Sequence, residues 1–318
     1  MRGEVLVANE HTQSSEPAVQ GNHPLLLKAN SKSLRQERRG KVLTSCGAFA
    51  IIALTIALII FISSKGFSTF VVNKISISEF LTGTEWSGNE GKYGAFNFIF
   101  GSLTVSLLAA CTAAPLGIGA ALFSTEIAPK WGRKIIQPAV EILGGIPSVV
   151  YGFIGLSVVV PFIRHNFGGT GFSLLAGVIV LTVMILPTVT SLSTDALSAI
   201  PRGLREASYA LGATRWQTIY RTLLPAALPG LLTAIVLGLA RAFGEALAVQ
   251  MVIGNSKAFP QSLVDTAHTL TSILTLEVGH TIPGSAYNNA LWSMAFILLL
   301  VTLLLVLLIR FLAKRRNV

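Results

Sequence analysis

The sequence contains few charged residues for its length. Asp, Glu, Lys and Arg together make up 12% of its 318 residues, whereas soluble domains carry roughly 25%. Cysteine occurs only twice, at Cys46 and Cys111, and both lie inside apolar stretches. The composition therefore excludes an ordinary soluble domain, and the cysteines give no support for a disulfide framework or a metal cluster.

Motifs that would give the chain its own chemistry are also missing. There is no G-x-x-x-x-G-K-[ST] nucleotide loop, so we do not expect the chain to hydrolyse ATP. There is no nucleophile elbow, and His165 and His280 each stand without a second ligand at a suitable spacing. We therefore expect a protein that is not itself an enzyme and that binds no cofactor and no metal.

The excess of positive charge does not indicate a nucleic-acid binder. Lys and Arg number 24 against 14 Asp and Glu, which gives a net charge of +10. These cations are dispersed around long apolar runs, where they fix the orientation of membrane spans. We expect membrane lipid, and no nucleic acid, as a partner.

Six apolar runs are long enough to cross a bilayer, which takes about 20 helical residues. The first run follows a polar segment without the pattern of a cleaved signal peptide, so we expect it to remain as a span. The sequence thus predicts an all-α membrane protein with six transmembrane helices. The runs are roughly 43–63, 96–123, 138–162, 173–193, 226–252 and 289–311.

The distribution of Lys and Arg predicts the orientation of these spans. If the N-terminus is cytoplasmic, eighteen of them fall in inner segments and five in outer loops. The positive-inside rule then places both termini and the segment 194–225 in the cytoplasm. The five outer residues are Lys65, Lys74, Lys92, Arg164 and Lys257.

Polar segments flank the spans. The tail 1–41 is polar and lacks periodicity, so we expect it to be disordered. Two outer loops, 64–95 and 253–288, are rich in Gly, Ser, Thr and Asn. Two interpretations of these loops are open: they receive an extracytoplasmic binding protein, or they are solvated connectors with a short helix each.

Arg241 and Glu245 are charged residues inside the fifth apolar run. Their i, i+4 spacing predicts one helix face, and a central charge costs about 2.5–3.5 kcal/mol on insertion scales. One interpretation places them on a substrate path, where a guanidinium fork suits an oxyanion and Glu245 holds the fork or accepts a proton. The other is a structural ion pair that locks two helices.

Glu141 and Pro147 mark the start of the third run. Glu141 lies a few residues beyond Lys134, so it either sits at the inner interface beside a loop cation or belongs to the path. Pro147 follows Gly144 and Gly145, which predicts a bend or an unwound turn. Such a break lines a path or gate in some membrane proteins and is a packing kink in others.

A patterned polar segment separates the fourth and fifth runs. Apolar residues recur at i, i+3, i+4 and i+7 from Leu204 and again from Trp216. This spacing predicts two short amphipathic helices with a glycine bend between them. On the cytoplasmic side, such a helix pair suits a soluble partner.

This segment resembles the EAA loop of ABC-type importer permeases, which docks into the ATP-hydrolysing subunit. Ser208 replaces the second Ala of the loop and Thr222 replaces the usual Ile, and neither change removes the bend. The resemblance implies that the matching residues couple the chain to an ATPase. They are Glu206, Ala207, Gly212, Leu224 and Pro225.

The chain also resembles the PstC-type permease family of bacterial phosphate ABC importers over roughly 45–312. Arg241 to Ala246 followed by Ile253-Gly254-Asn255 is the most specific match. Others include Tyr93-Gly94, Gly101 to Ser106, Ala120 to Glu126, and Glu141 to Gly152. PstA-type sister subunits share the architecture, and Ile253-Gly254-Asn255 favours the PstC type.

The resemblance implies a multi-pass protein of the bacterial plasma membrane that imports phosphate with several partners. They are a PstA-like second permease, two copies of a cytosolic ABC ATPase and an extracytoplasmic phosphate-binding protein. Three alternatives stay open: import of another oxyanion such as sulfate or molybdate, the PstA-type role, and a channel or scaffold that works without ATP.

The resemblance also divides the chain. We expect an added first transmembrane helix at 42–64, an extracytoplasmic loop at 65–95 and a short cytoplasmic tail at 312–318. Residues 96–311 then form the type I ABC importer transmembrane domain, with spans two to six and the EAA loop at 201–225.

Overall fold

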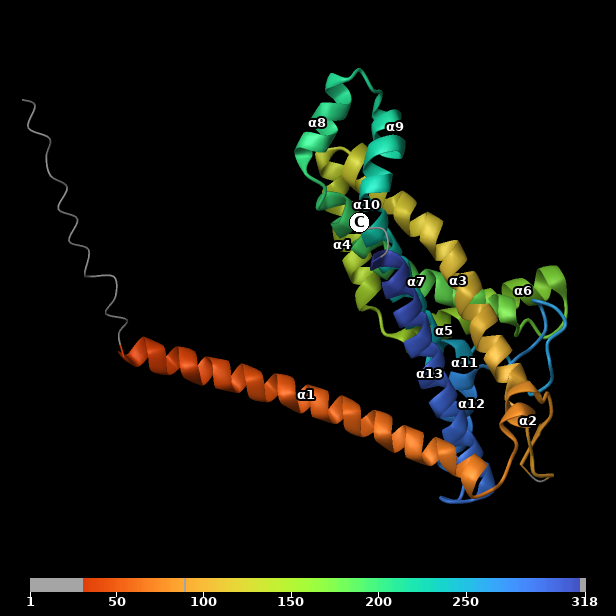
Figure 1. Cartoon of the computed structure of the whole chain (residues 1–318). Coiled ribbons are helices and arrows are strands. Elements are labelled where there is room, and N and C mark those ends of the chain that lie inside the picture. The colour runs from red at the N-terminus through yellow and green to blue at the C-terminus, as the bar shows by residue number, and fades with distance from the viewer. Residues whose placement is uncertain (1–30, 89, 315–318) are drawn as a thin grey trace, which may run out of the picture. The chain divides into compact units, whose positions relative to one another are not determined.

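The computed structural model describes residues 31–88 and 90–314, and nearly all of its regular structure is helical (Figure 1). Six helical stretches in the described residues are long and apolar enough to cross a membrane. The predicted all-α protein with six transmembrane helices is therefore confirmed. The six stretches are Glu37–Val71, Phe96–Ile127, Ser148–Phe167, Leu174–Ser198, Arg215–Phe243 and Ala286–Leu307.

The first helix is longer than the sequence predicted. The chain divides into two units, 1–58 and 59–318, and helix α1 (Ser31–Val71) contributes to both. Residues 31–41, expected in a disordered tail, are helical because Leu, Arg, Gln, Glu and Lys are good helix formers. The rest of that tail, 1–30, lies outside the described residues.

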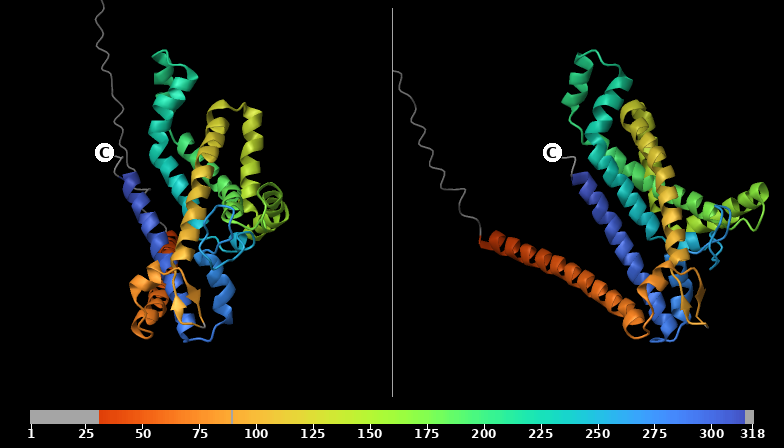
Figure 2. Two further views of the ribbon diagram at one scale, coloured as in Figure 1. Left: turned by 90° about the vertical axis from the view of Figure 1, so that its right-hand side faces the viewer. Right: turned by 45° about the vertical axis from the view of Figure 1, so that its right-hand side comes forward.

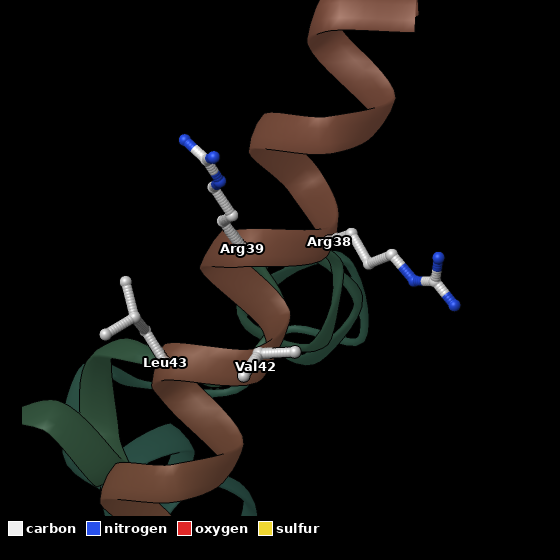
Figure 3. Close-up of a pocket in the computed structure, with 4 residues that line it drawn as sticks. All are labelled: Arg38, Arg39, Val42 and Leu43. Atoms are coloured by element: carbon white, nitrogen blue, oxygen red, sulfur yellow. The ribbon is translucent and has the colours of Figure 1, made fainter.

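The first unit presents a boundary between basic and apolar surface. Arg38, Arg39, Val42 and Leu43 surround a shallow hollow on α1, and all four side chains point outward from this one helix (Figure 3). Beyond them the large apolar side chains remain exposed, as at Phe49. A helix that is apolar all round suits lipid, with its cations at the interface.

One end of the 59–318 unit, here named the hairpin end, is packed with aromatic side chains. Strands β1 (Trp86–Ser87) and β2 (Lys92–Tyr93) pair antiparallel, and Trp86 stacks edge to face on Phe98 at 5.4 Å. The buried Phe80 and Phe243 join this cluster. The helices at this end are α2 (Ile77–Thr82), α12 (Leu270–Glu277), the 3₁₀ turn η4 (Val278–His280) and the start of α13 (Ala286–Lys314).

The middle of the unit is a bundle around two long helices. Helix α3 (Phe96–Leu122) packs along α7 (Leu174–Ser198), and α10 (Leu224–Phe243) packs against both. Val105, Leu181 and other small or branched apolar residues are fully enclosed between them. These apolar contacts hold the three helices at a close distance.

The third span begins later than its apolar run of 138–162. Helix α4 (Lys130–Gly145) is separate, and the chain is extended at Ile146 before Pro147. A proline disfavours helical geometry in the residue before it, which favours a helix end at this point. The predicted bend is confirmed, and the predicted start is wrong. The span consists of α5 (Ser148–Ile154), the π-helical turn η2 (Gly155–Val159) and α6 (Val160–Phe167).

The fifth span ends earlier than its apolar run of 226–252. Helix α10 stops at Phe243, and the chain unwinds before the short helix α11 (Leu247–Gln250). Gly244 follows α10 directly, and glycine is a poor helix former. The predicted continuous helix across this region is therefore wrong.

The other end of the unit, here named the α8 end, carries a projecting helix pair (Figures 1 and 2). Helix α8 (Arg202–Ala210) and helix α9 (Arg215–Thr218) form the pair. The π-helical turn η3 (Ile219–Leu223) joins α9 to α10, and the π-helical turn η1 (Phe123–Ile127) ends the α3 span. Such turns inside long helices occur often at functional sites.

Two glycines of α3 allow a matched test of this packing. A Cβ at Gly101 would overlap the carbonyl oxygen of His268, whereas a Cβ at Gly119 meets nothing within 4 Å. We expect Gly101→Ala to destabilise the protein by about 1–3 kcal/mol through overpacking. Gly119→Ala should be neutral or stabilise by about 0.5–1 kcal/mol through helix propensity. Thermal unfolding in detergent measures both, and equal midpoints would contradict the packing.

Candidate functional site

Arg241 is a half-buried cation held between α10 and α7. Its Nη1 donates a hydrogen bond to Oγ1 of Thr188 at 2.7 Å. The ion pairs of the described residues do not include Arg241. Because one neutral hydroxyl leaves most guanidinium donors unused, the group has capacity for a further anionic partner.

Glu245 does not share a helix face with Arg241, so the predicted i, i+4 pair is wrong. Helix α10 ends at Phe243 with Gly244 as its C-cap, so Glu245 lies beyond the helix. Oε1 of Glu245 instead accepts a hydrogen bond from the backbone N–H of Ala248 at 3.1 Å. Its carbonyl oxygen accepts one from Oγ1 of Thr271 at 2.7 Å. The carboxylate thus caps the first turn of α11.

Glu141 lies exposed on α4 and lines a polar cavity between α4 and α7. Nε2 of Gln137 donates to Oε1 of Glu141 at 3.3 Å, and Asp195 of α7 lines the same cavity. The ion pairs in the described residues do not include Glu141, and its pairing with a loop cation stays a prediction. Two carboxylates facing one cavity create a region of negative potential.

Pro147 marks a break that is held by a side chain rather than left loose. The hydroxyl of Tyr151 in α5 donates to the carbonyl oxygen of Leu143 in α4 at 2.7 Å. The same carbonyl oxygen accepts the N–H of the C-cap residue Ile146 at 3.3 Å, so the tyrosine adds a second bond at the end of α4. The break between α4 and α5 is therefore a defined corner of the fold.

The predicted pair of short helices with a glycine bend between them is confirmed. Gly212 has a φ of +79° between α8 and α9, a conformation that glycine adopts without strain. Thr214 begins α9 through a capping box with Gln217. One feature differs: the second helix does not end but continues through η3 into α10. Leu224 and Pro225 therefore form the first turn of the α10 span.

The outer surface of this helix pair is open. No residue of α8 is buried, and Glu206 and Ala207 are both exposed. Apolar side chains are exposed beside them: Leu211 retains 89% of its surface and Trp216 retains 67%. Contiguous exposed apolar residues rimmed by charge are typical of a protein interface.

Three residues near these sites were not found from the sequence. Thr188 carries no more signal than any other threonine in a span. Asp195 follows the fourth apolar run, where its position next to the interface makes a carboxylate unremarkable. Glu126, which binds Arg205, lies in a segment that matches the PstC pattern without a role. Only their contacts reveal them.

The chain has the architecture of a permease subunit, and comparison with known families identifies its class. Residues 113–318 match the family described as binding-protein-dependent transport system inner membrane component. This match spans more than half of the chain, and the protein belongs to this family of ABC importer permeases. It is thus a multi-pass membrane protein.

Within this family the similarity to PstC-type permeases is confirmed. The chain is 33% identical to the phosphate transport system permease protein PstC of Xylella fastidiosa (strain 9a5c), over 86% of this chain and 89% of that protein. It is 34% identical to PstC of Mesorhizobium japonicum, over 74% and 78%. It is also 58% identical to the probable ABC transporter permease protein YqgH of Bacillus subtilis (strain 168), over 91% and 95%.

Solved structures confirm the type I importer fold. A chain of a bacterial alginate ABC transporter in complex with its periplasmic protein aligns with a TM-score of 0.61 at 19% identity, covering 88% of this chain and 96% of that chain. A chain of the inward-facing MetNI methionine ABC transporter aligns with a TM-score of 0.55 at 23% identity, covering 68% and 93%. At these low sequence identities, the similarity shows a shared fold and not a shared substrate.

Proposed function

We propose that this chain is the PstC-type permease subunit of an ATP-driven phosphate importer. It forms part of the translocation path and transmits the work of cytosolic ATPases to that path. The observation that carries this function is the half-buried Arg241, which has a hydroxyl partner and no carboxylate partner in the described residues. The PstC names of its relatives supply the substrate.

An oxyanion is the substrate class that best suits Arg241. Leaving a cation in a membrane span without a counter-ion is costly, and such residues mark ion pathways by default. The planar guanidinium binds tetrahedral oxygens through parallel hydrogen bonds and stays charged at every physiological pH. A passing phosphate therefore supplies the counter-charge that the described residues do not provide.

The helix pair at the α8 end is the proposed ATPase docking element. Glu206, Ala207 and Gly212 match the EAA pattern on an exposed surface. Leu224 begins α10 and Arg241 lies near its end, about 25 Å further along at 1.5 Å per residue. One continuous helix therefore links the docking element to the proposed substrate contact.

The remaining partners and the orientation follow from this assignment. The α8 end and both termini lie in the cytoplasm, in line with the distribution of Lys and Arg. A PstA-like permease faces this chain, two ATPase copies bind the cytoplasmic side, and a phosphate-binding protein docks at the hairpin end. Glu141 and Pro147, at the corner between α4 and α5, belong to the inner part of the path or its gate.

Import of another oxyanion is the second candidate, because sulfate and molybdate present the same tetrahedral oxygens. The two are separated by reconstituting the chain with its partner subunits and measuring uptake of labelled phosphate. We expect an excess of unlabelled phosphate to abolish the uptake of labelled phosphate. The same concentration of sulfate or molybdate should leave this uptake unchanged. Competition by sulfate or molybdate alone would reassign the substrate.

The structure changes the role that we assign to Glu245. If it only caps α11, Glu245→Gln keeps an acceptor oxygen for the Ala248 N–H and should retain most phosphate uptake. Glu245→Ala removes the cap and should lower stability by about 0.5–2 kcal/mol. Uptake and thermal unfolding are measured for both variants. A severe loss of uptake in the stable Gln variant would instead show that the carboxylate accepts a substrate proton.

A further inference from the structure

Glu126 is the least exposed acidic member of any ion pair in the described residues. It lies in η1 at the end of the α3 span, and 11% of its side chain is exposed. Its Oε1 accepts hydrogen bonds from Nη2 of Arg205 at 2.8 Å and from Nε at 3.2 Å. A shielded, charge-assisted contact of this kind is stronger than an exposed ion pair.

Arg205 holds the end of α7 as well. Its Nη1 donates to the carbonyl oxygen of Ile200 at 2.9 Å, and its Nη2 donates to that of Leu197 at 3.0 Å. Leu197 lies in the last turn of α7, where the helix dipole favours a cation. One guanidinium therefore binds η1, the end of α7 and its own helix α8 together.

Helix α9 also contacts Glu126. Nη2 of Arg215, at the start of α9, donates to the backbone carbonyl oxygen of Glu126. Both helices of the projecting pair thus meet η1 at one point. Beneath it, Ile219 and Leu223 are buried with Ala121 of α3 in a separate apolar cluster.

These polar contacts matter because α8 has no apolar anchor of its own. None of its residues is buried. Besides the contacts of Arg205, its side-chain hydrogen bond to the rest of the described chain is the one of 2.9 Å between the hydroxyls of Ser208 and Thr218. Only residues 199–201 join it to α7. Without the contacts of Arg205, a displacement of α8 would change the backbone of this connector and of Gly212 and would not move α7.

We propose that Glu126 and Arg205 are positioning residues that make α8, η1 and the end of α7 move as one body. A displacement of the helix pair then reaches the α3 and α7 spans instead of dissipating in the connector. The inference rests on the proposed function in one respect: α8 is the element that the ATPase displaces. The role belongs to energy coupling, because both residues lie at the junction between the proposed docking element and the spans.

The first test measures coupling in the complete transporter, reconstituted with its second permease, ATPase and binding protein. The ion pair of Glu126 and Arg205 is here named the joint. Glu126→Gln and Arg205→Gln, the joint variants, each remove one of its charges. Lys134→Gln is the matched control, since it removes a positive charge from an exposed position on α4, outside the helix pair, where the described residues form no hydrogen bond or ion pair with it. The measurement is labelled inorganic phosphate transported per ATP hydrolysed, together with the amount of ATPase that co-purifies.

We expect both joint variants to retain the ATPase while phosphate transported per ATP falls about tenfold, the loss that one charge-assisted hydrogen bond predicts. The double variant should equal Arg205→Gln, because that change already removes the contact that Glu126→Gln breaks. Lys134→Gln should keep the wild-type ratio. A wild-type ratio in the joint variants, or an equal loss in Lys134→Gln, overturns the proposal.

The second test follows the motion directly and needs no substrate. Spin labels are placed at Gly119→Cys in α3 and Gly203→Cys in α8, where an added side chain meets nothing within 4 Å. The native Cys46 and Cys111 are replaced by Ser. The distance between the labels is measured in the complete transporter with and without ATP bound.

We expect one narrow distance that does not change when ATP binds, because both labels belong to one body. In the Glu126→Gln background the distribution should broaden and shift with ATP. If ATP shifts the label distance by the same amount in the transporter that keeps Glu126, the proposal that these elements move as one body is overturned. If the transporter without these substitutions moves no phosphate, the proposal that phosphate is its substrate is rejected. The label distances still test whether the elements move as one body.

Discussion

Replacing Arg241 by Gln is expected to reduce phosphate uptake to roughly a hundredth of the wild-type rate. The reason is that a desolvated charge pair is worth about 2–5 kcal/mol when one partner is truncated, and each 1.4 kcal/mol is a factor of ten. Glutamine fills a similar volume and still donates hydrogen bonds, but it brings no charge to the anion. The measurement is uptake of labelled phosphate by cells that depend on this permease.

Further variants separate the charge from its support. Arg241→Lys keeps the charge without the fork and should retain part of the uptake. Thr188→Val removes the hydroxyl that holds the guanidinium and should cause a smaller loss. Thr182→Val is the matched control, because it removes another α7 hydroxyl, bonded to Thr112 at 2.7 Å. Unchanged uptake in Arg241→Gln, at equal amounts in the membrane, would reject the proposed function.

The second large effect is expected for Glu206→Lys, which should abolish co-purification of the ATPase. Glu206 is exposed in the middle of α8, so the change does not disturb the fold of this chain. It reverses one charge in the proposed docking surface, and like charges across an interface cost several kcal/mol. Retention of the ATPase on the purified permease measures the effect.

A charge reversal elsewhere controls for this result. Glu37→Lys makes the same exchange in the exposed part of α1 and should leave ATPase retention at the wild-type level. Thermal unfolding should be equal in the two variants. If the Glu206→Lys protein binds its ATPase and transports phosphate normally, α8 is not the docking element.

Much of the fold could be predicted because a bilayer imposes a simple rule. A span needs about 20 apolar residues, and every backbone group inside it must be bonded within its helix. The six apolar runs therefore corresponded to the six spans. The helix pair was also predictable, because its apolar period and Gly212 specify local structure.

The ends of the helices could not be read from hydropathy. The apolar runs continued through Gly244 and began before Pro147, although both residues interrupt helices. Hydropathy records the cost of burial in lipid and not the backbone geometry. Each misplaced boundary changed a site: one separated Glu245 from Arg241, and the other moved Glu141 onto a helix outside the third span.

The contacts that join distant segments were the least predictable. Glu126 and Arg205 are 79 residues apart, and nothing in either local pattern marks them as partners. The same holds for Thr188 and Arg241, 53 residues apart. Such pairs depend on which helix faces meet, and the period of a single helix does not contain that information.

The sequence by itself determined that this protein is an all-α permease with six spans and an exposed helix pair, because apolar length, charge position and local turn chemistry act over short stretches. Only the tertiary structure decided which charges are partnered. Packing α3, α7, α8 and α10 together bound Glu126 to Arg205, placed the Glu245 carboxylate at the start of α11 and left Arg241 without a carboxylate partner in the part of the chain that the structure describes. Those outcomes depend on three-dimensional proximity, which sequence spacing does not specify across separate helices.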